Sequence, residues 1–517
     1  MNRPIRRVAA VLGVLFAALF INLNIVQVLK GNEYRNHAGN ERVLLTEYAN
    51  PRGQIVVQGT SVAQSVPTTD ELKYLRQYPQ GPVYAPLTGY FSLVYATSAL
   101  ENAENSVLSG DDPRLFGSQL TDLLTGRNKR GGSVVLTVSK AAQDAAYKAM
   151  QNPNGTFKRG AVVALDPTTG AILAAVSTPS FDPSQLSSHN SAAITAYWSE
   201  LTKDPSQPLL NRAFNQLYAP GSVFKVVVSA AALKAGVHKD DQIPAVNYYW
   251  PLGGSGPCPA NGAAACVHNF GNETCENGAT ASLDFALAKS CNTAFAQLAV
   301  ERIGGERLKQ QAQAFGLNGA QLDVPLGIAP STIGTPQDLL DKAALAQTAF
   351  GQRDVRISPL QAAMISSAVA NQGVLMKPYL VAQERAPNLS LLSSTQPSQL
   401  SQVLDPQLDQ ELQQMMVDVV TSPEGTGGPA KITTLGPSVV VGGKTGTADT
   451  GIFVNGKETP PNAWFSGFAL QNGNPKIAVA VVIENGGVTG DETTGGLAAA
   501  PVAREVMEAY LRSVTAK

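Results

Sequence analysis

Residues 219–225 read APGSVFK, and an apolar run, VVVSAAAL, follows them. The Pro-Gly pair breaks the chain just before this run, so we expect a helix with Ser222 in its first turn. Lys225 then lies three residues on, on the same face of that helix. A serine hydroxyl needs a neighbouring base to become a nucleophile, and lysine can serve when apolar surroundings and nearby positive charge lower its pKa. The segment therefore predicts a Ser222 nucleophile with Lys225 as its base.

The S-x-x-K spacing alone is weak evidence, because it arises by chance on the order of once or twice in a chain of ordinary composition. The alternative is a serine at a helix start and a lysine whose stem lies along the surface. Two later segments favour the catalytic interpretation: Ser290-Cys291-Asn292, after an apolar helical run, and Lys444-Thr445-Gly446-Thr447, after the strand-like VVVGG. S-x-x-K, S-x-N and K-T-G in this order form the motif set of the serine enzymes that penicillin acylates.

The chain resembles the class B penicillin-binding proteins, and most closely their penicillin-binding protein A branch. The stretches that carry the resemblance span about residues 160–470: GAVVALDPTTGAILAAVSTPSFDP, NRAFNQLYAPGSVFK, ALAKSCNTAFA, GGKTGTAD and NAWFSGFA. PRGQIV, near residue 51, matches the N-terminal region of the family more loosely. The resemblance implies a penicillin-binding/β-lactamase-like fold: an anchor helix, an accessory domain, and a transpeptidase domain with a five-stranded antiparallel sheet flanked by helices.

The resemblance also implies a role for each catalytic residue in peptidoglycan D,D-transpeptidation. Ser222 attacks the carbonyl carbon of the D-Ala-D-Ala bond in a stem peptide, and Lys225 accepts its proton. Ser290 relays that proton to the departing D-alanine, Asn292 holds the substrate amide, and Lys444 contributes positive field. The acyl group then passes to an amine of a neighbouring stem peptide, or to water in a carboxypeptidase side reaction. A β-lactam mimics the donor and leaves Ser222 acylated.

Substrate binding is assigned by the same resemblance to the K-T-G segment, that is, to Thr445, Gly446 and Thr447. The two threonine hydroxyls suit the terminal carboxylate of the donor. The backbone N–H groups of Ser222 and Thr447 would hold the oxyanion, and one such donor typically lowers a barrier by about 2.7–4 kcal/mol.

The N-terminus predicts a membrane anchor. Arg3, Arg6 and Arg7 precede residues 8–28, a stretch of 21 residues without a charge, and about 20 apolar residues cross a bilayer as a helix. Basic residues before the span favour a cytoplasmic tail at 1–7 and a single-pass protein of the cell membrane with an extracytoplasmic catalytic domain. The alternative is a cleaved signal peptide, but the run exceeds the usual apolar core of ~7–15 residues and no A-x-A site follows it.

Two folded units are expected after the anchor: an accessory, non-catalytic domain at 29–154 and a transpeptidase domain at 155–517. Asn152-Pro153-Asn154-Gly155 is a strong break, and GAVVALD, PTTG and AILAAVST then indicate a hairpin. Strand patterns at both ends of the second unit, with helices between, favour an α+β fold. Residues 387–405 are rich in serine and glutamine and are expected to form an exposed loop.

The four cysteines, Cys258, Cys266, Cys275 and Cys291, lie within 34 positions. Their spacings fit no C-x-x-C zinc pattern, so they indicate one or two disulfides in an oxidising compartment. Three pairings are possible if all four are oxidised. Cys258–Cys266 with Cys275–Cys291 is favoured, because each bond closes a short local loop. Since Cys291 is the middle residue of S-x-N, a disulfide there would brace that motif; the alternative is a buried free thiol.

The composition excludes some classes of partner. With 38 basic against 39 acidic residues, the chain lacks the basic footprint of a nucleic-acid-binding protein. No metal and no cofactor are expected, because metal-binding and phosphate-loop motifs are absent from the sequence. The family resemblance implies peptidoglycan stem peptides, β-lactams and a separate membrane glycan polymerase as partners, and the N-terminal span adds the cytoplasmic membrane. The region before residue 155 is too small to hold a glycosyltransferase of its own.

Three rival functions use the same motifs. A β-lactamase shares the nucleophile but needs a base for a deacylating water, and the sequence offers none that we can assign. A β-lactam sensor normally needs further spans or a cytoplasmic domain. An inactive scaffold is disfavoured by the intact motifs.

Overall fold

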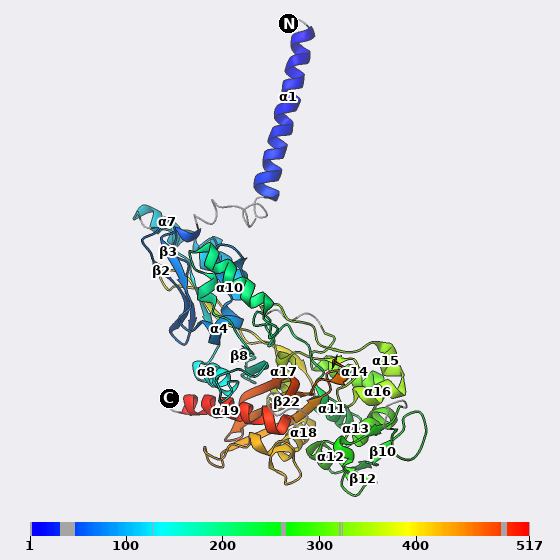
Figure 1. Ribbon diagram of the computed structural model, residues 1–517. Helices are drawn as coiled ribbons and strands as arrows, with labels where there is room; N and C mark the ends of the chain where they lie inside the picture. Colours follow the sequence, from blue (N-terminus) through cyan, green and yellow to red (C-terminus); the bar gives the residue numbers. More distant parts are fainter. Residues whose placement is uncertain are drawn as a thin grey trace.

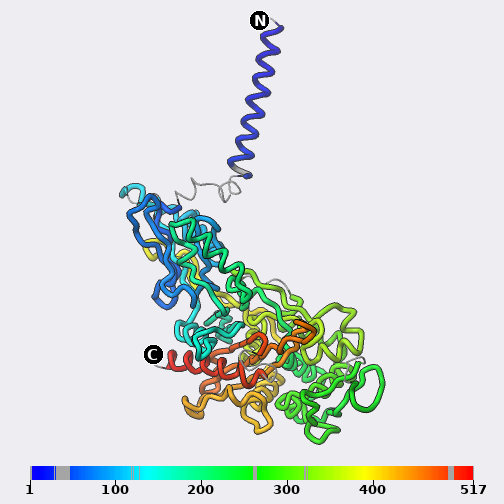
Figure 2. Tube along the Cα trace, in the orientation of Figure 1, coloured from blue at the N-terminus to red at the C-terminus, as the bar shows by residue number. Residues whose placement is uncertain are grey.

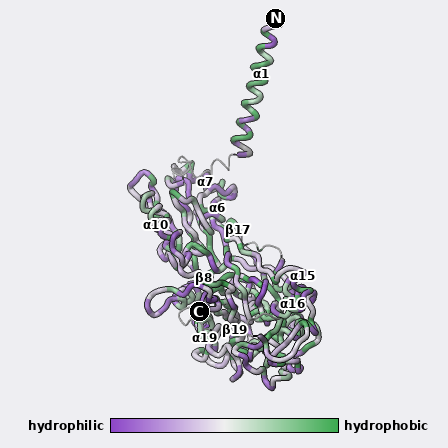
Figure 3. Tube along the Cα trace, turned by 45° about the vertical axis from the view of Figure 1, so that its right-hand side comes forward, coloured by the Kyte–Doolittle hydropathy of each residue, from purple (hydrophilic) through white to green (hydrophobic). Residues whose placement is uncertain are grey.

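The computed structural model describes residues 3–30, 47–126, 128–259, 265–319, 322, 324–486 and 494–515. Its first element is helix α1 (Arg3–Asn24), which continues as a π-helical stretch to Leu29. The stretch Arg3–Gln27 has a mean hydropathy of 2.3 and none of it is buried within the protein. Figure 3 shows hydrophobic residues along most of α1. In the described part of the chain it is the one helix long and apolar enough to cross a membrane.

The centre of the C-terminal half is a five-stranded sheet. The strands follow the order β19 (Val439–Ala448), β22 (Asn462–Gln471), β23 (Asn474–Ile483), β7 (Gly160–Leu165) and β8 (Ile172–Thr178). Every neighbouring pair is antiparallel, so the sheet expected from the sequence is confirmed. The strands are buried on both faces, and successive residues contribute to opposite sides: Val162 and Ala164 to one core, Ala161 and Val163 to the other.

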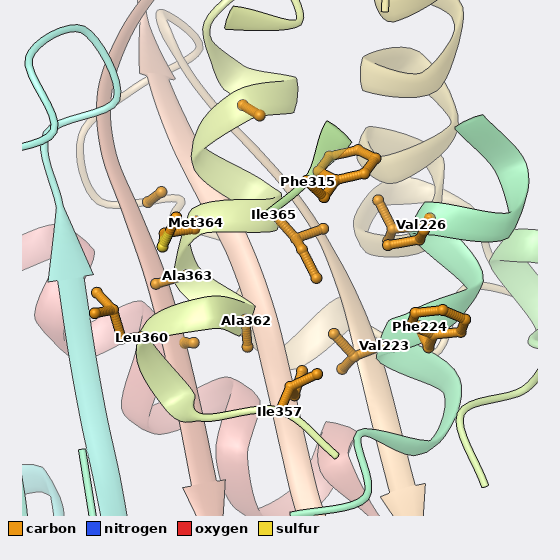
Figure 4. Packing of buried hydrophobic residues seen from close by; sticks show 14 of the residues in the cluster. Val223, Phe224, Val226, Phe315, Ile357, Leu360, Ala362, Ala363, Met364 and Ile365 are labelled. Carbon is orange, nitrogen blue, oxygen red and sulfur yellow. The ribbon is translucent and has the colours of Figure 1, made fainter. Parts of the chain in front are cut away.

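Helices cover both faces of this sheet. On one face lie α8 (Lys140–Ala149) and α19 (Gly495–Thr515), whose apolar residues share a core with the sheet. On the other face lies α17 (Pro359–Ala370), which is buried along its whole length. Figure 4 shows its apolar residues packed between the strands and the segment that follows Ser222; they include Leu360, Ala362, Ala363, Met364 and Ile365 of α17 and Val223, Phe224 and Val226 of that segment. Helix α11, which follows the turn that holds Ser222, therefore packs against the main hydrophobic core.

A helical lobe beside α17 carries the second motif (Figure 1). Its helices are α11 (Lys225–Lys234), α12 (Leu283–Lys289), α13 (Asn292–Leu298), α14 (Gly305–Ala314), α15 (Pro336–Leu340), α16 (Lys342–Thr348) and α18 (Pro406–Thr421). Helix α11 packs against α12, α14 and α18, which fixes the S-x-x-K helix relative to the S-x-N segment.

The N-terminal half is built on a six-stranded sheet. Its order is β17 (Leu391–Ser394), β16 (Val381–Arg385), β6 (Ser133–Leu136), β1 (Ile55–Val57), β2 (Thr60–Pro67) and β3 (Tyr74–Gln77). Strands β16 and β17 come from the C-terminal half of the chain. Figure 2 shows this segment, in yellow, among the blue strands of the N-terminal half. The two halves of the molecule are therefore interleaved along the sequence.

The remaining helices of this half are short, apart from α10: α4 (Gly81–Thr88), α5 (Ala99–Ala103), α6 (Asn105–Ser109), α7 (Phe116–Leu124), α9 (Pro183–Leu186) and α10 (Ser191–Lys203). The division at residue 155 stays a prediction, and residues 31–46 of the accessory domain lie outside the described residues. The structure adds that α8, which precedes residue 155, packs against α19 and β8.

The expectation of a loop at 387–405 was wrong. Residues 391–394 form β17, and residues 399–402 form β18 (Gln399–Gln402), which pairs with β15 (Val374–Met376). Most side chains of β17 and β18 are partly or fully exposed. Backbone pairing at a sheet edge, rather than burial of alternate apolar residues, makes these strands, so their polar sequence gave no strand signal.

The core of the N-terminal half contains a buried charge cluster. The Glu101 carboxylate accepts hydrogen bonds from Arg52 Nε at 2.5 Å and Arg76 Nε at 2.6 Å, and from the Tyr78 hydroxyl at 3.1 Å. All four side chains are buried. The two guanidinium groups attract the carboxylate, so the pKa of Glu101 lies below its usual value although burial alone would raise it.

Glu101→Ala is expected to lower the free energy of unfolding by about 3–5 kcal/mol, because it leaves two buried guanidinium groups without a counter-charge. Urea denaturation of the full chain in detergent measures this change. Glu306→Ala is the matched control, since Glu306 lies on the surface in a weak pair with Lys309. A loss for Glu101→Ala no larger than that for Glu306→Ala would contradict the prediction.

Candidate active site

The nucleophile segment forms a single 3-10 turn, Gly221–Phe224, that leads directly into α11. Ser222 thus lies in this turn, just before the helix in whose first turn it was expected. Gly221 adopts a left-handed conformation with φ 54°, and its amide donates to the carbonyl of Gly351 at 3.0 Å. A Cβ at Gly221 would lie 2.6 Å from the Thr447 carbonyl oxygen. Only glycine therefore allows the turn to approach β19 this closely.

Lys225 is completely buried beneath the turn. Its Nζ lies 2.7 Å from the carbonyl oxygen of Ser290, 2.7 Å from Asn292 Oδ1 and 3.3 Å from Ser290 Oγ. Burial lowers the pKa of Lys225 well below the usual lysine value, and the charge of Lys444 lowers it further. The side chain is therefore suited to hold a neutral amine.

The S-x-N segment is the junction between two helices. Helix α12 ends at Lys289, Ser290 is left-handed with φ 70°, Cys291 is extended, and α13 begins at Asn292. This sharp turn places the Ser290 hydroxyl between the two lysines: Lys444 Nζ donates to Ser290 Oγ at 2.9 Å. The Asn292 side-chain amide donates to the carbonyl of His268 at 3.2 Å, which fixes its orientation.

The K-T-G segment lies within β19. Lys444 is fully buried, and burial lowers its pKa to about 7. The Thr445 hydroxyl lies 2.6 Å from that of Thr426. A Cβ at Gly446 would lie 2.6 Å from the Pro220 carbonyl oxygen, so glycine lets the strand contact the nucleophile segment. The strand thus holds Thr445 and Thr447 beside Ser222.

A cavity of about 540 Å³ opens above these residues, and Ser222, Ser290, Asn292, Thr445 and Thr447 line it. Lys225, Lys444 and Gly446 lie behind its wall. The structure therefore brings together every predicted catalytic and substrate-binding residue.

Several further lining residues were not predicted from the sequence. They include Asn269, Phe270, Lys289, Gln352, Thr426 and Asp449. Each comes from a loop or a helix end outside the three motifs, so only the fold shows that they line the cavity.

The cysteines form the two expected local pairs, Cys258–Cys266 and Cys275–Cys291. Cys275 and Cys291 line the catalytic cavity, so their bond ties its wall to the S-x-N segment.

Reduction of Cys275–Cys291 is expected to slow penicillin acylation by on the order of tenfold, because Ser290 and Asn292 lose a constraint on their positions. The rate of acylation is measured by quenching the reaction with a fluorescent penicillin at successive times, with and without dithiothreitol. A variant with both Cys258→Ser and Cys266→Ser is the control: it should respond to the reductant as the wild type does. An unchanged rate in the reduced wild type would remove the bracing role.

A buried lysine beneath a turn-borne serine, a second buried lysine on a strand, and a five-stranded sheet between helices define a penicillin-recognising serine acyltransferase. Two family profiles match the chain: "Penicillin binding protein transpeptidase domain" at residues 160–508 and "Penicillin binding protein A dimerisation domain" at residues 52–134. The chain belongs to the penicillin-binding protein A family of transpeptidases, which confirms the resemblance inferred from its motifs.

Curated relatives and solved structures agree. The chain is 43% identical over 513 residues to "Peptidoglycan D,D-transpeptidase PbpA" of Mycolicibacterium smegmatis, covering 99% of each chain. It is 41% identical over 512 residues to the protein of the same name from Mycobacterium tuberculosis, again covering 99% of each. The ceftriaxone acyl-enzyme complex of penicillin-binding protein A from M. tuberculosis superposes with a TM-score of 0.82 at 42% identity, covering 90% of this chain and 100% of that one. The penicillin G acyl-enzyme complex gives a TM-score of 0.80 at 42% identity, covering 89% and 100%.

Proposed function

We propose that this chain is a peptidoglycan D,D-transpeptidase that cross-links stem peptides through an acyl-enzyme on Ser222, and that β-lactams acylate the same serine. One observation carries the proposal: Lys225 and Lys444, behind the cavity that Ser222 lines, are joined in a hydrogen-bonded chain through Ser290, which lines it. The relatives named as D,D-transpeptidases and the acyl-enzyme complexes support it.

The contacts of Lys225 favour its role as the base. A neutral amine has two hydrogens and one lone pair. The carbonyl oxygen of Ser290 and Asn292 Oδ1, each at 2.7 Å, are acceptors for the two hydrogens. The lone pair is left for a hydroxyl donor, which is Ser290 at 3.3 Å in this structure and would be Ser222 as its oxygen attacks the donor carbonyl.

The remaining motif residues act on the tetrahedral intermediate. The backbone N–H groups of Ser222 and Thr447 stabilise the oxyanion. Ser290, hydrogen-bonded to both lysines, passes the proton to the leaving D-alanine, while Asn292 holds the donor amide. Lys444 contributes positive charge, and Thr445 and Thr447 bind the terminal carboxylate. An amine of a second stem peptide then displaces Ser222.

Helix α1 is proposed to anchor the protein in the cell membrane as a single span, with residues 1–7 in the cytoplasm and the catalytic half outside. Arg3, Arg6 and Arg7 before the span favour this orientation. Residues 29–154 would then form the accessory domain and residues 155–517 the transpeptidase domain. A separate membrane polymerase would supply the glycan strands.

Turnover of a thioester donor tests the proposed function. The full chain in detergent is mixed with a thioester analogue of acyl-D-Ala-D-Ala and an amine-bearing peptide, and the products are separated by mass. A cross-linked product, together with stable penicillin labelling, is the expected result. Rapid loss of label with destruction of the antibiotic would indicate a β-lactamase, and one acylation without turnover would indicate a sensor; either outcome would overturn the proposal.

A further inference from the structure

A second, smaller pocket adjoins the catalytic cavity. It measures about 260 Å³, and Asp449, which lines the catalytic cavity, lines it as well. Tyr218 and Ala219, the residues just before the Pro220-Gly221-Ser222 turn, form another part of its wall. A molecule seated in this pocket would therefore lie within reach of the acylated Ser222, on the side of Asp449.

Glu484 lines the pocket, and groups of the protein occupy both oxygens of its carboxylate. Glu484 Oε1 accepts hydrogen bonds from Arg212 Nε at 2.8 Å and from the Tyr218 hydroxyl at 2.7 Å. Its other oxygen, Oε2, pairs with Arg159 Nε at 3.0 Å. Arg212 is completely buried, and the Glu484 side chain is 12% exposed. Both oxygens of Glu484 are thus used by the protein itself, so Glu484 does not repel an anionic ligand as a free carboxylate would.

Arg356 supplies a guanidinium group that remains available. It ends the short strand β14 (Val355–Arg356), and it is half-buried in the wall of the pocket. Its Nη1 donates to the carbonyl oxygens of Arg353 at 2.7 Å and Val355 at 2.9 Å, which holds the group in place. No carboxylate among the described residues pairs with it. Its remaining N–H groups have the geometry that binds a carboxylate.

The pocket has a negative charge at the end that adjoins the catalytic cavity and positive charges farther inside. A carboxylate, Asp449, stands where the pocket meets the catalytic cavity, and the cationic groups of Arg356 and Arg159 stand within the pocket. A peptide with an amine directed at Ser222 and a carboxylate farther away matches this order, because its ammonium form is attracted to Asp449 and its carboxylate to Arg356.

We propose that this pocket is the acceptor subsite, in which Arg356 binds a carboxylate of the stem peptide whose amine attacks the acyl-enzyme. The proposal rests on the proposed function and names the substrate of its second half-reaction. In that step the acceptor nitrogen bonds to the acyl carbon and the bond from that carbon to Ser222 Oγ breaks. The bound ammonium group first releases one proton to water, and a second proton passes from the attacking nitrogen to Ser222 Oγ, so the step needs no further reactant.

Partitioning of the acyl-enzyme between amine and water tests this subsite. The full chain in detergent is acylated with the thioester donor and offered one of two acceptors. Both are the same short peptide with a single side-chain amine, one ending in a carboxylate and the other in a carboxamide. The wild type is expected to prefer the carboxylate acceptor about tenfold. Arg356→Gln should remove that preference through a higher KM for the carboxylate acceptor, with hydrolysis and penicillin labelling within about twofold of the wild type.

Arg353→Gln is the matched control. Arg353 lies in the same segment but faces Asp338 and Asp354 and does not line the pocket, so the acceptor preference should persist. If Arg356→Gln fails to fold, as loss of penicillin labelling would show, Arg356→Lys keeps the positive charge and should retain part of the preference. Equal use of both acceptors by the wild type, or an unchanged preference in Arg356→Gln, would overturn the subsite. Absence of any acyl-enzyme in the wild type would instead overturn the proposed function, and the subsite with it.

Discussion

Ser222→Ala is expected to abolish covalent labelling by penicillin and to lower transfer from a thioester donor by roughly 10⁴-fold or more, because removal of a covalent nucleophile eliminates the acyl-enzyme route. The cavity, Lys225 and the oxyanion donors remain in place, so non-covalent binding of the donor should persist. Intact-mass spectrometry after incubation with penicillin measures the labelling, and product analysis measures the transfer.

Ser229→Ala is the matched control for this variant. Ser229 lies on the same helix, α11, and is fully buried, and its hydroxyl has no hydrogen-bond partner among the described residues. Its removal should leave labelling unchanged. Penicillin adduct formation on Ser222→Ala at the rate of Ser229→Ala would place the nucleophile elsewhere.

Lys225→Met is expected to lower the acylation rate by about 10²–10⁴-fold, since it removes the general base while nearly preserving the buried volume. The wild-type rate should rise with pH as Lys225 loses its proton. Burial and the charge of Lys444 lower the pKa of Lys225, so this rise should be complete well below the usual lysine value of 10.5. The variant should lack that rise.

The rate of labelling by a fluorescent penicillin between pH 5 and pH 10 provides the measurement. Lys234→Met is the control, because Lys234 lies in the last turn of the same helix and does not line the catalytic cavity. A Lys225→Met profile that kept both the rate and the pH dependence of the wild type would assign the base to another group.

Much of the catalytic half could be predicted from the sequence because its signals are local. The strand of residues 439–448 shows an apolar run that ends in K-T-G, and the S-x-x-K turn shows Pro-Gly before an apolar helix. The order of the three motifs then identified the fold family, and with it the five-stranded sheet. The hydrogen bonds that join Lys225, Ser290 and Lys444 follow from that fold.

Other features have no local signal. Thr426 follows α18 in a loop without a motif, yet its hydroxyl meets that of Thr445. Glu484 and Arg212 are 272 positions apart, and nothing in either segment indicates their pairing. Strands β16 (VAQER) and β17 (LLSS) show no alternation of apolar and polar residues, and they join the accessory sheet through backbone pairing. Contacts of this kind depend on how distant segments are arranged in the complete fold, and no single segment of the sequence indicates them.

The pairing of β16 with β6 in the N-terminal sheet also determines when that sheet can be completed during synthesis. Strand β6 pairs with β1 on one side, and its other side stays open until residues 381–385 have been synthesised. During that interval the free edge presents unpaired backbone groups that can pair with other chains. A chaperone that shields extended segments would therefore raise the yield of folded protein. A fragment that stops before residue 381 would keep the open edge permanently and aggregate.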